Sequence, residues 1–354
     1  MKSLIFGYGI TGQSIERYLK KKDVAFSIYD KNVTGPNIIN RLPDQKFLES
    51  FDTVYLSPGI NIKKIYPDGQ FNHIQYVTDL DIFFQEDNSY KIGITGTNGK
   101  STCCYHLHQL LDGSQLIGNI GSPVLDYINS SKYSIIELSS FHLEKVKDIK
   151  LDLGVLLNIA PDHIDHHGSF KEYKKVKNRI KESKISTEES DPKKLWSMIT
   201  GNHQIEIKDI KLLDLPHRQE LVATIGKLIF VNDSKATNLT ALEFALKKIS
   251  YPCVLILCGD PNKENYKNYH IVGPKKVYIF GKHASEISKR VFHPEKIILQ
   301  SKGISSVMKL ILQDIYDCQT SILFSPGHPS GKDYKNFEER GDHFIKFVKS
   351  SHDS

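Results

Sequence analysis

The sequence predicts an α/β protein of three domains, each built on a mainly parallel sheet. Short apolar runs are repeatedly followed by a glycine-containing turn and then by a helical pattern, which is the order of a βαβ unit. A chain of 354 residues with 39% hydrophobic and 25% charged side chains has the length and composition of two or three globular domains. The pattern starts afresh twice, so we place the domains at residues 1–88, 89–213 and 214–354.

The first domain opens with an apolar strand over residues 3–6, a glycine turn and a helix over about 12–22. A strand over 25–29 follows and ends at Asp30, and a further apolar run over 53–56 ends in a Ser-Pro-Gly loop. Loops at the carboxyl ends of parallel strands commonly face a ligand. These features predict a Rossmann-like domain with an open sheet.

The second and third domains show the same alternation. In the second, we predict strands over 91–95, 134–138 and 153–157, helices over 100–111 and 170–184, and a linker over 186–192. In the third, we predict strands over 228–231, 254–258, 276–280 and 322–324, and helices over 239–248 and 304–316. A glycine-rich loop after its first strand makes the second domain P-loop ATPase-like, and the third is again Rossmann-like.

Charge and cysteine content narrow the class of protein. Lys and Arg number 47 against 41 Asp and Glu, a net charge of +6, which suits acidic small-molecule substrates without requiring nucleic acid. The five cysteines show no CxxC spacing, so we expect reduced thiols in the cores. No apolar run approaches the roughly 20 residues of a membrane span, and the N-terminal run is too short for a signal peptide. We therefore expect a cytoplasmic protein with no membrane partner.

The strongest local signal is the loop Gly93-Ile94-Thr95-Gly96-Thr97-Asn98-Gly99-Lys100-Ser101-Thr102, between a predicted strand and a predicted helix. Its glycines let backbone N–H groups turn toward phosphate oxygens, and the following helix adds positive potential. Lys100 can reach the β- and γ-phosphates, and Ser101 can bind Mg²⁺. Ile94 stands where the GxxxxGK[ST] pattern has its first glycine. The alternative is a glycine turn with an exposed lysine.

The first domain carries a weaker pattern, Gly7-Tyr8-Gly9-Ile10-Thr11-Gly12, with Asp30 located 18 residues after its last glycine. A GxGxxG pattern after a strand, with such an acid, is typical of dinucleotide binding and would indicate a nicotinamide oxidoreductase. The pattern alone is short, and Asp30 has an alternative role as a capping or loop acid.

The GTNGKST core resembles the phosphate loop of the Mur ligases and of their folylpolyglutamate synthetase relatives, which are ATP-dependent amide-forming enzymes. Further segments are similar to motifs of this family in all three predicted domains. They are Glu137–Glu144 (similar to ELSSFQLE), Asn158–His167 (N-x-x-x-DHxDRH), Tyr173 with Lys177 (Y-x-x-x-K), Leu215–Arg218 with Glu220, Asn232–Asn238, Ser325–Ser330 and Lys335–Gly341. The NDSKATN and KNFEERG segments resemble the D-glutamate-adding member of the family.

The resemblance implies an ADP-forming ligase that joins D-glutamate to UDP-N-acetylmuramoyl-L-alanine through an acyl phosphate, in peptidoglycan synthesis for the cell wall. Its cofactors would be ATP, two Mg²⁺ ions and a CO2-derived carbamate on Lys177, and it would act as a monomer. By resemblance, the catalytic residues are Lys100, Glu137, His163 and Lys177. The metal ligands are Ser101, Glu137, His163 and carbamylated Lys177.

The resemblance also distributes the substrate contacts over the three domains. ATP would contact Gly96, Thr97, Asn98, Gly99, Lys100, Ser101, Thr102, Arg218, Asp233 and Lys235. The UDP-sugar would contact Ile10, Thr11, Asp30, Lys31, Gly59, Asn119, Ser139 and His163. D-Glutamate would contact Thr237, Lys263, Ser330 and Phe337.

The chemistry of these side chains supports the implied roles. Glu137 and His163 offer an oxygen and an imidazole ligand for a divalent ion between ATP and an acceptor carboxylate. Metal ions and Lys100 would neutralise the charge on the transferred phosphoryl group. A plain Lys177 ammonium would repel Mg²⁺, whereas its carbamate is an anionic oxygen ligand. The alternatives are a solvated lysine on a charged helix face, and zinc bound by the Asp162–His167 cluster, which lacks cysteine ligands.

The predicted central domain is short for the family. Only residues 178–214 separate Lys177 from the LPHR segment, so several strands and helices are expected to be missing or shortened. Gly201–Gln204 stands where the family has a GxHN segment that contacts adenine, with Gln204 in place of Asn. This shortening leaves open a non-catalytic nucleotide-binding protein with a regulatory or scaffold role, which the retained GTNGKST loop and its catalytic partners oppose.

The predicted glutamate site also departs from the family. Asn262 stands at the position of the lysine that holds glutamate, and Lys263 would replace that lysine. Gly331 stands in place of a leucine after Ser330. These changes leave open an amide ligase for a different amino acid, or one that extends folate with glutamate, although NDSKATN and KNFEERG favour D-glutamate.

Overall fold

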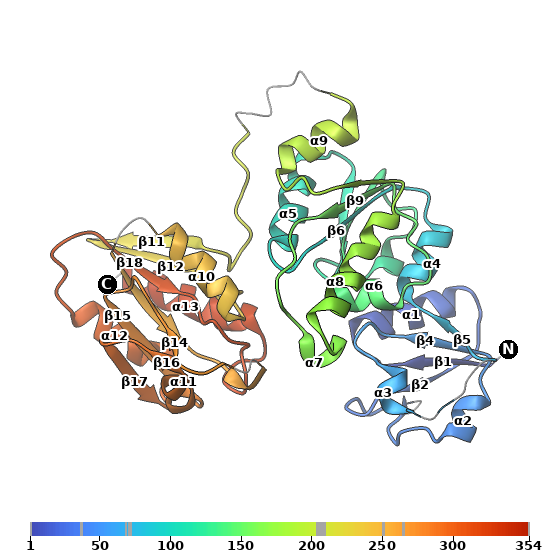
Figure 1. Ribbon diagram of the computed structural model, residues 1–354, viewed down its shortest axis with the longest axis horizontal. Coiled ribbons are helices and arrows are strands. Elements are labelled where there is room, and N and C mark those ends of the chain that lie inside the picture. The colour runs from blue at the N-terminus through green and yellow to red at the C-terminus, as the bar shows by residue number, and fades with distance from the viewer. Residues whose placement is uncertain are drawn as a thin grey trace. The chain divides into compact units, whose positions relative to one another are not determined.

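The computed structural model describes residues 2–35, 38–67, 69, 73–202, 210–249, 252–263 and 266–352. The chain divides into two compact units, Met1–Leu213 and Asp214–Ser354. In the described residues, the first unit contains two five-stranded sheets and the second contains one six-stranded sheet, with helices packed against them (Figure 1). The predicted α/β class with mainly parallel sheets is confirmed.

The first sheet has the strand order β3-β2-β1-β4-β5, and its pairs are parallel. Its strands are β1 (Ser3–Phe6), β2 (Phe26–Tyr29), β3 (Ile38–Ile39), β4 (Thr53–Leu56) and β5 (Gln75–Val77). The helices are α1 (Ile10–Lys21), α2 (Gln45–Glu49), α3 (Ile62–Ile65) and α4 (Asp79–Glu86). All four residues of the central strand β1 are buried, which explains why its sequence is almost continuously apolar.

The second sheet has the order β10-β9-β6-β8-β7 and is also parallel. Its strands are β6 (Tyr90–Thr95), β7 (Ser114–Gly118), β8 (Tyr133–Glu137), β9 (Leu153–Leu156) and β10 (Ile185–Thr187). The helices are α5 (Lys100–Leu110), α6 (Ser140–Lys145), α7 (Ile164–His167), α8 (Phe170–Asn178) and α9 (Pro192–Thr200), with 3-10 helices η1 (Val124–Tyr127) and η2 (Arg179–Glu182).

Two sequence predictions in this region are wrong. The helix predicted over 170–184 is α-helical only to Asn178 and continues as η2, after which the Ser183 hydroxyl donates to the Ile180 carbonyl at 2.6 Å. The linker predicted over 186–192 contains most of β10 and the first residue of α9. Helix α9 begins where the Asp191 side chain accepts from the Lys193 N–H and proline occupies the first helical position.

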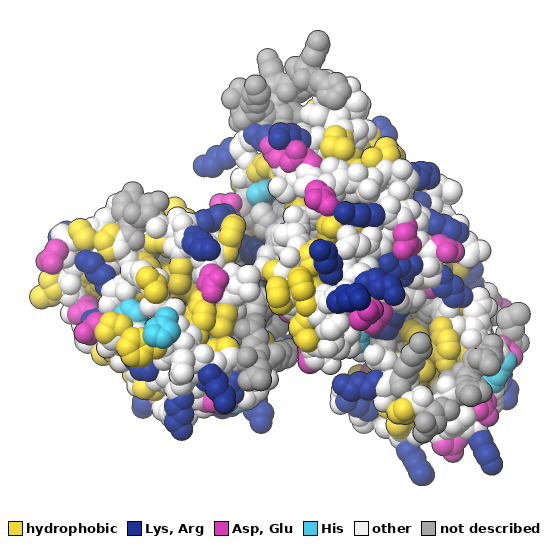
Figure 2. Space-filling view, in the orientation of Figure 1, with side chains coloured by type: hydrophobic (Ala, Val, Ile, Leu, Met, Phe, Trp, Pro, Cys, Tyr) yellow, Lys and Arg dark blue, Asp and Glu magenta, His cyan; other side chains and the backbone are white. Residues whose placement is uncertain are grey.

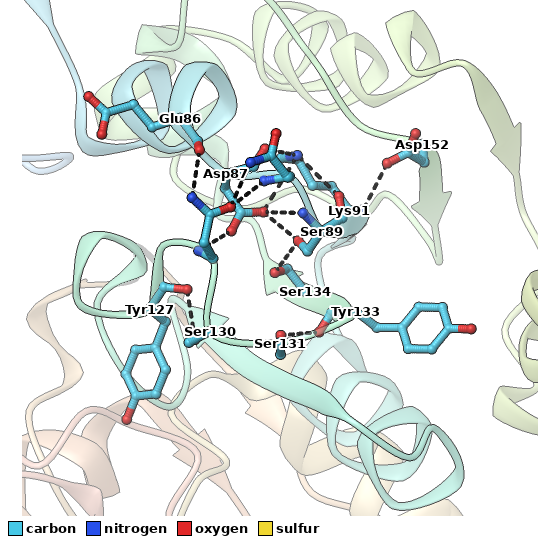
Figure 3. A network of polar contacts seen from close by, with 12 residues as sticks. Glu86, Asp87, Ser89, Lys91, Tyr127, Ser130, Ser131, Tyr133, Ser134 and Asp152 are labelled. Atoms are coloured by element: carbon cyan, nitrogen blue, oxygen red, sulfur yellow. Dashed lines mark hydrogen bonds and ion pairs between the residues drawn. The ribbon is translucent and has the colours of Figure 1, made fainter.

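A buried polar network fixes the amino end of β6, the strand that precedes the glycine-rich loop (Figure 3). The Lys91 ammonium donates to the carbonyls of Asp87 at 2.6 Å and Ser89 at 3.1 Å, and lies 3.5 Å from an Asp87 carboxylate oxygen. The Ser89 hydroxyl lies 2.6 Å from that of Ser134 on β8, and the Lys91 N–H donates to Asp152 before β9 at 2.8 Å. The network therefore ties β6 to both neighbouring strands.

The third sheet has the order β11-β12-β18-β13-β15-β17, in which only the β11·β12 pair is antiparallel. Its strands are β11 (Glu220–Ile225), β12 (Leu228–Asn232), β13 (Cys253–Leu257), β15 (Lys276–Gly281), β17 (Lys296–Gln300) and β18 (Thr320–Phe324). Helices are α10 (Leu239–Lys248), η4 (Pro261–Lys263), α11 (Ala284–Arg290), α12 (Ile304–Gln313) and α13 (Phe337–His352); β14 (Tyr269–His270) pairs with β16 (Val291–Phe292).

One further prediction needs correction. Four cysteines, Cys103, Cys104, Cys253 and Cys258, are free and buried, as expected, but Cys318 is free and exposed. No helix within the described ranges is long and apolar enough to cross a membrane. On the face shown in Figure 2, acidic side chains lie among the basic ones on both units.

Candidate active site

The carboxyl ends of four parallel strands bring together the strongest predicted site residues. The glycine-rich loop follows β6, Glu137 ends β8, Asn158 follows β9 and Asn119 follows β7. In the sheet register, Ile94 lies opposite Glu137, and Thr95 lies opposite Leu156. Because the strands run in the same direction, their terminal side chains share one edge of the sheet.

The loop after β6 is held by backbone and side-chain contacts from the next strand. The Thr97 N–H donates to the Asn158 carbonyl at 2.9 Å, and the Asn98 N–H donates to the Asn158 side chain at 3.0 Å. The Asn158 amide returns a bond to the Asn98 carbonyl at 2.9 Å. Gly99 precedes α5 with a φ of +84°, a conformation that favours glycine. The predicted phosphate-binding residues thus form a loop, Gly96, Thr97, Asn98 and Gly99, and the first turn of α5, which contains Lys100, Ser101 and Thr102.

Two lysines converge on this loop. The Lys100 ammonium donates to the carbonyls of Gly96 at 2.8 Å and Thr97 at 2.9 Å. The Lys177 ammonium also donates to the Gly96 carbonyl at 2.8 Å, and to the Thr95 hydroxyl at 3.1 Å. Lys177 is only 2% exposed. Burial, reinforced by the nearby Lys100 charge, lowers the pKa of Lys177 to about 6.

The Y-x-x-x-K spacing places Tyr173 one helical turn before Lys177 on α8, so both reach the same loop. The Tyr173 hydroxyl lies 3.1 Å from the Thr97 hydroxyl, and the Lys177 Nζ lies 5.5 Å from the centre of the Tyr173 ring. The Thr97 hydroxyl also accepts from the Ala160 N–H at 2.9 Å. Helix α8 is therefore held against the phosphate loop by both members of the motif.

Glu137 is a buried carboxylate with one oxygen suited to bind a metal ion. It is 2% exposed, and Oε1 accepts from the Asn119 amide at 2.8 Å. Its other oxygen, Oε2, is buried and has no hydrogen-bond partner. A buried carboxylate oxygen without a partner is costly, and a divalent cation at this edge would satisfy it. A carboxylate oxygen here and the Ser101 hydroxyl in the first turn of α5 are the oxygen donors that Mg²⁺ prefers.

His163 lies at a strained backbone position before α7. Its φ is +51°, which is rare for a residue other than glycine, and its side chain is 45% exposed. Burial lowers the pKa of His163 against the opposing effect of Asp162, whose carboxylate lies 3.6 Å from the ring. The imidazole is consequently neutral near pH 7, the form in which it binds metals.

A pocket of about 480 Å³ opens at the carboxyl edge of the first sheet. Three predicted UDP-sugar contacts, Asp30, Lys31 and Gly59, line it. Lys64 and His166 also line it and were missed. His166 comes from α7, which lies between β9 and β10 of the second sheet, so short-range sequence patterns do not reveal its position. Ile10 and Thr11 begin α1 and are not among the lining residues, and Ile10 is 73% exposed.

Asp30 organises the glycine turn of the first domain. Its carboxylate accepts from the backbone N–H groups of Tyr8 at 2.7 Å, Asn32 at 2.8 Å and Val33 at 3.2 Å. Burial alone would raise the pKa of Asp30, but these three donors together hold it below its ordinary value. Asp30 thus holds its loop by hydrogen bonds and also lines the pocket.

Ser139, another predicted sugar contact, is the N-cap of α6. Its hydroxyl accepts from the His142 N–H at 3.2 Å, and its own backbone N–H donates to the His142 Nδ1 at 3.3 Å, so the two residues form a capping box. Asn119, as described, is bonded to Glu137. Asn119 follows β7 and Ser139 comes two residues after the end of β8, so both lie at the carboxyl ends of paired strands of the second sheet.

In the second unit, the carboxyl ends of β12, β18 and β13 are adjacent and parallel. Asp233 follows β12 and is buried; it accepts from the Ser325 hydroxyl at 2.7 Å and the Gln219 N–H at 3.2 Å. Burial raises the pKa of Asp233 to about 6, although Ser325 and the Arg218 charge oppose this. The Lys235 ammonium lies 5.0 Å from the centre of the Phe337 ring.

The remaining predicted residues of this unit lie on the same loops. Thr237 directly precedes the N-cap of α10, and Ser330, 9% exposed, lies in the loop after β18. Lys263 ends η4, and its side chain lies outside the described part of the structure. In the first unit, Gly201 ends α9 with a φ of +68°, and His203 and Gln204 of the expected adenine segment also lie outside the described residues.

Arg340 is a positioning residue that motif matching did not assign. It is fully buried and donates to the Ser234 hydroxyl at 3.0 Å, the Ser234 carbonyl at 2.6 Å and the His328 carbonyl at 3.0 Å. It thereby joins α13 to the loops that carry Lys235 and Ser330. The next residue, Gly341, allows close packing, because a Cβ there would lie 2.2 Å from the His217 ring.

Comparisons with known proteins agree with this geometry. The family model of the Mur ligase middle domain matches residues 94–190. The chain is 30% identical to the UDP-N-acetylmuramoylalanine–D-glutamate ligase of Buchnera aphidicola subsp. Schizaphis graminum over 435 aligned positions, covering 98% of each chain. It is 26% identical to the ligase of the same name from Rickettsia prowazekii, covering 98% of this chain and 97% of the relative. Since 435 positions exceed the 354 residues of this chain, the Buchnera relative contains segments without a counterpart here.

Solved structures share the fold at low sequence identity. The MurF ligase from Thermotoga maritima in complex with ADP has a TM-score of 0.56 at 14% identity, covering 99% of this chain and 95% of that one. A pseudomurein peptide ligase type C from Methanothermus fervidus has a TM-score of 0.52 at 13% identity, covering 99% of both. These neighbours show the fold, and the relative that is 30% identical over nearly the whole chain shows the class, a ligase. The chain belongs to the Mur ligase family, as its sequence motifs predicted.

Proposed function

We propose that the chain joins D-glutamate to UDP-N-acetylmuramoyl-L-alanine, coupled to cleavage of ATP to ADP and phosphate, in peptidoglycan synthesis. The relatives that carry this activity in their name support the substrate assignment. The observation that carries the chemistry is the edge of the second sheet. There the phosphate loop, two lysines and a buried Glu137 oxygen without a protein partner converge.

In the first proposed step, a carboxylate oxygen of the UDP-sugar substrate attacks the γ-phosphorus of ATP, and ADP leaves. The loop N–H groups at the start of α5 hold the phosphates, and Lys100 exchanges its bonds to loop carbonyls for bonds to phosphate oxygens. In the second step, the unprotonated amine of D-glutamate attacks the acyl phosphate carbon, the C–O bond to phosphate breaks, and the departing phosphate carries away the amine proton. Although burial lowers the pKa of Lys177, Asp162 and Glu137 lie close enough to oppose this effect, and Asp162 also opposes the lowering of the His163 pKa, so these groups belong to one site.

Mg²⁺ supplies charge neutralisation for the phosphoryl group when bound. We propose that Ser101, Glu137, His163 and carbamylated Lys177 hold two ions. The unpartnered Glu137 oxygen and the neutral His163 ring support these assignments. The protein's own contribution is to keep these donors fixed at the sheet edge.

The carbamate on Lys177 follows from the environment of that amine. Only an unprotonated amine attacks CO2, and a pKa near 6 leaves the amine mostly unprotonated at neutral pH. The product is an anion that attracts the Lys100 ammonium, whereas the neutral amine it replaces does not. Its oxygens would lie at the phosphate loop, because the Lys177 Nζ contacts the Gly96 carbonyl.

We predict that Lys177→Ala loses most of its activity and that acetate or formate partly restores it, because a small carboxylate can replace the missing carbamate. Lys174→Ala, an exposed lysine on the same helix, serves as the control and should keep its rate. The measurement is phosphate release with and without added carboxylate. A Lys177→Ala variant as active as the natural chain would remove the carbamate from the proposal.

The substrates are proposed to divide among the predicted domains, 1–88, 89–213 and 214–354. The pocket at the first sheet, lined by Asp30, Lys31 and Gly59, would hold the uridine diphosphate. The loops of the third sheet would hold the rest of ATP and D-glutamate, through Arg218, Asp233 and Lys235, and through Thr237, Lys263, Ser330 and Phe337. A cytoplasmic, monomeric enzyme without a nucleic-acid partner remains our expectation, and size-exclusion chromatography tests the oligomeric part.

The decisive test is the substrate dependence of phosphate release. Purified protein with ATP, Mg²⁺, UDP-N-acetylmuramoyl-L-alanine and D-glutamate should release phosphate, and omission of any one should abolish the release. A panel that includes L-glutamate, D-aspartate and lysine identifies the amino acid. Release with another amino acid in preference to D-glutamate would change the substrate, and no release under any condition would favour a non-catalytic role.

A further inference from the structure

Three side chains that the proposed reaction does not use meet beside α7. Glu144 comes from the end of α6, and His166 and His167 come from α7. Their potential ligand atoms all lie within 4.8 Å of one another. The His166 Nε2 lies 2.7 Å from one Glu144 oxygen, and the His167 Nδ1 lies 3.6 Å from the other. The acid that joins the two histidines is thus Glu144, which is distant in the sequence, and not an aspartate of the DHIDHH segment.

The two imidazoles are held in place by aromatic and hydrogen-bond contacts. The Phe141 ring stacks on His167 with centroids 5.8 Å apart and meets His166 at a steep angle with centroids 4.6 Å apart. The His167 Nε2 lies 3.0 Å from the Ser140 hydroxyl. Metal-bound histidines commonly use their second nitrogen in such a bond, which fixes the ring and its tautomer. When Nε2 carries the proton, the Nδ1 lone pair faces a carboxylate oxygen, an arrangement that a cation stabilises.

We propose that Glu144, His166 and His167 form a binding site for a zinc-type transition-metal ion. Two imidazoles and one carboxylate are a donor set that Zn²⁺ prefers, whereas Mg²⁺ favours oxygen ligands in an octahedron. The site is therefore chemically distinct from the Mg²⁺ site proposed at Glu137. The opposing charge is Lys145, whose ammonium lies 3.9 Å from Glu144 and donates to the Pro58 carbonyl.

The exposure of the three side chains indicates where a fourth ligand enters. The His167 side chain is 1% exposed, whereas those of His166 and Glu144 are 14% and 31% exposed. His166 also lines the pocket of the first sheet, so the open coordination position lies at the rim of that pocket. An anionic phosphate oxygen of a bound nucleotide is the ligand that fits there. This last step rests on the proposed function, but metal binding itself does not.

Metal binding is tested on the full-length, metal-free protein without ATP or amino acid. Zn²⁺ is titrated against a chromophoric chelator, and Co²⁺ serves as the spectroscopic probe. We expect one Zn²⁺ per chain with micromolar affinity, a tetrahedral Co²⁺ absorption band, and no displacement by excess Mg²⁺. The variants His166→Gln, His167→Gln and Glu144→Gln should each weaken binding at least tenfold. His270→Gln, an exposed histidine of the second unit, should bind as the natural chain does.

A further variant separates this site from the proposed catalytic site. Glu137→Gln should retain the Zn²⁺ site in full, and circular dichroism confirms that each variant is folded. Absence of Zn²⁺ binding, or binding that the three Gln variants leave unchanged, would overturn the proposal. Repeating the titration with UDP tests the fourth ligand: UDP should raise the Zn²⁺ affinity, and an unchanged affinity would reject the phosphate ligand while the metal site stands.

Discussion

Lys177 sits in an environment that disfavours its own charge. Its side chain is 2% exposed, and a second ammonium, that of Lys100, contacts the same Gly96 carbonyl. The pKa falls from 10.5 to about 6 in the folded chain. Between these two values the unfolded chain binds one more proton than the folded chain, so folding stability rises with pH over this window and falls as pH drops toward 6.

We predict that Lys177→Met removes this pH dependence. Methionine retains a long apolar side chain but does not titrate. In CO2-free buffer, the free energy of unfolding of the natural chain relative to the variant should rise between pH 6.5 and 9, by at most about 1.4 kcal/mol per pH unit. Denaturant titrations at four pH values measure it, with Lys174→Met as control. Parallel stability curves for the natural chain and Lys177→Met would show that Lys177 is charged when folded.

At this scale, sequence patterns and the family resemblance indicated which side chains gather but not their state. The GTNGKST loop follows a predicted strand and Glu137 lies at the end of another, whereas the Tyr173–Lys177 pair was indicated by its resemblance to the Y-x-x-x-K motif of the family. The burial of Lys177 and the unpartnered Glu137 oxygen depend on neighbours far along the chain. The same is true of Arg340, whose partners lie on two other loops.

At the scale of secondary-structure elements, helix α6 depends on a residue that is also a predicted substrate contact. The Ser139 hydroxyl caps the helix by accepting from the His142 N–H at 3.2 Å. Helix α6 carries Glu144 and Phe141, and it directly follows the strand that ends at Glu137. A weaker cap would therefore disturb both the sheet edge and the cluster at α7.

Ser139→Ala should lower the free energy of unfolding by about 1 kcal/mol, because the first turn of α6 loses its acceptor. Ser139→Asn keeps an N-cap side chain and should stay close to the natural stability. Denaturant unfolding measures both variants. If Ser139→Asn is stable yet has a raised KM for the UDP-sugar, the hydroxyl also contacts substrate; equal stability of all three proteins would contradict the capping role.

Continuous apolar runs predicted the bounds of β1 and β4, whereas the edge strand β10 lacks such a run and was missed. Strands β1 and β4 match their predicted bounds because their residues form short continuous apolar runs. Strand β10, at the sheet edge, has two exposed residues out of three and no apolar run, so it was taken for a linker. Helix α8 ends early because η2 and the Ser183 contact replace its last turns.

At the scale of the whole molecule, the chain consists of two compact units that meet in sequence at Leu213 and Asp214. The first unit contains the pocket at the first sheet, the phosphate loop and the cluster at α7. The second contains its own sheet and two apolar cores. A unit with its own core is expected to fold without the rest of the chain.

We predict that fragments 1–213 and 214–354 each fold cooperatively. Because every residue that lines the pocket belongs to the first unit, UDP should stabilise fragment 1–213 and the full chain alike, by about 2.7 kcal/mol at one hundred times its dissociation constant. It should leave fragment 214–354 unchanged. Thermal unfolding with and without UDP measures this, and stabilisation confined to the full chain would mean that the second unit completes the pocket.

The Lys100 side chain, folded back on the carbonyls of Gly96 and Thr97, has one more consequence. When a triphosphate binds, the Lys100 ammonium must exchange its hydrogen bonds to the loop carbonyls for hydrogen bonds to phosphate oxygens. Binding therefore adds fewer hydrogen bonds than it would if Lys100 had no partners. Calorimetry should then measure a small binding enthalpy for the nucleotide, and the affinity should come mainly from the entropy of released water and ions. The loop carbonyls hold the Lys100 ammonium close to the place where phosphate oxygens would bind.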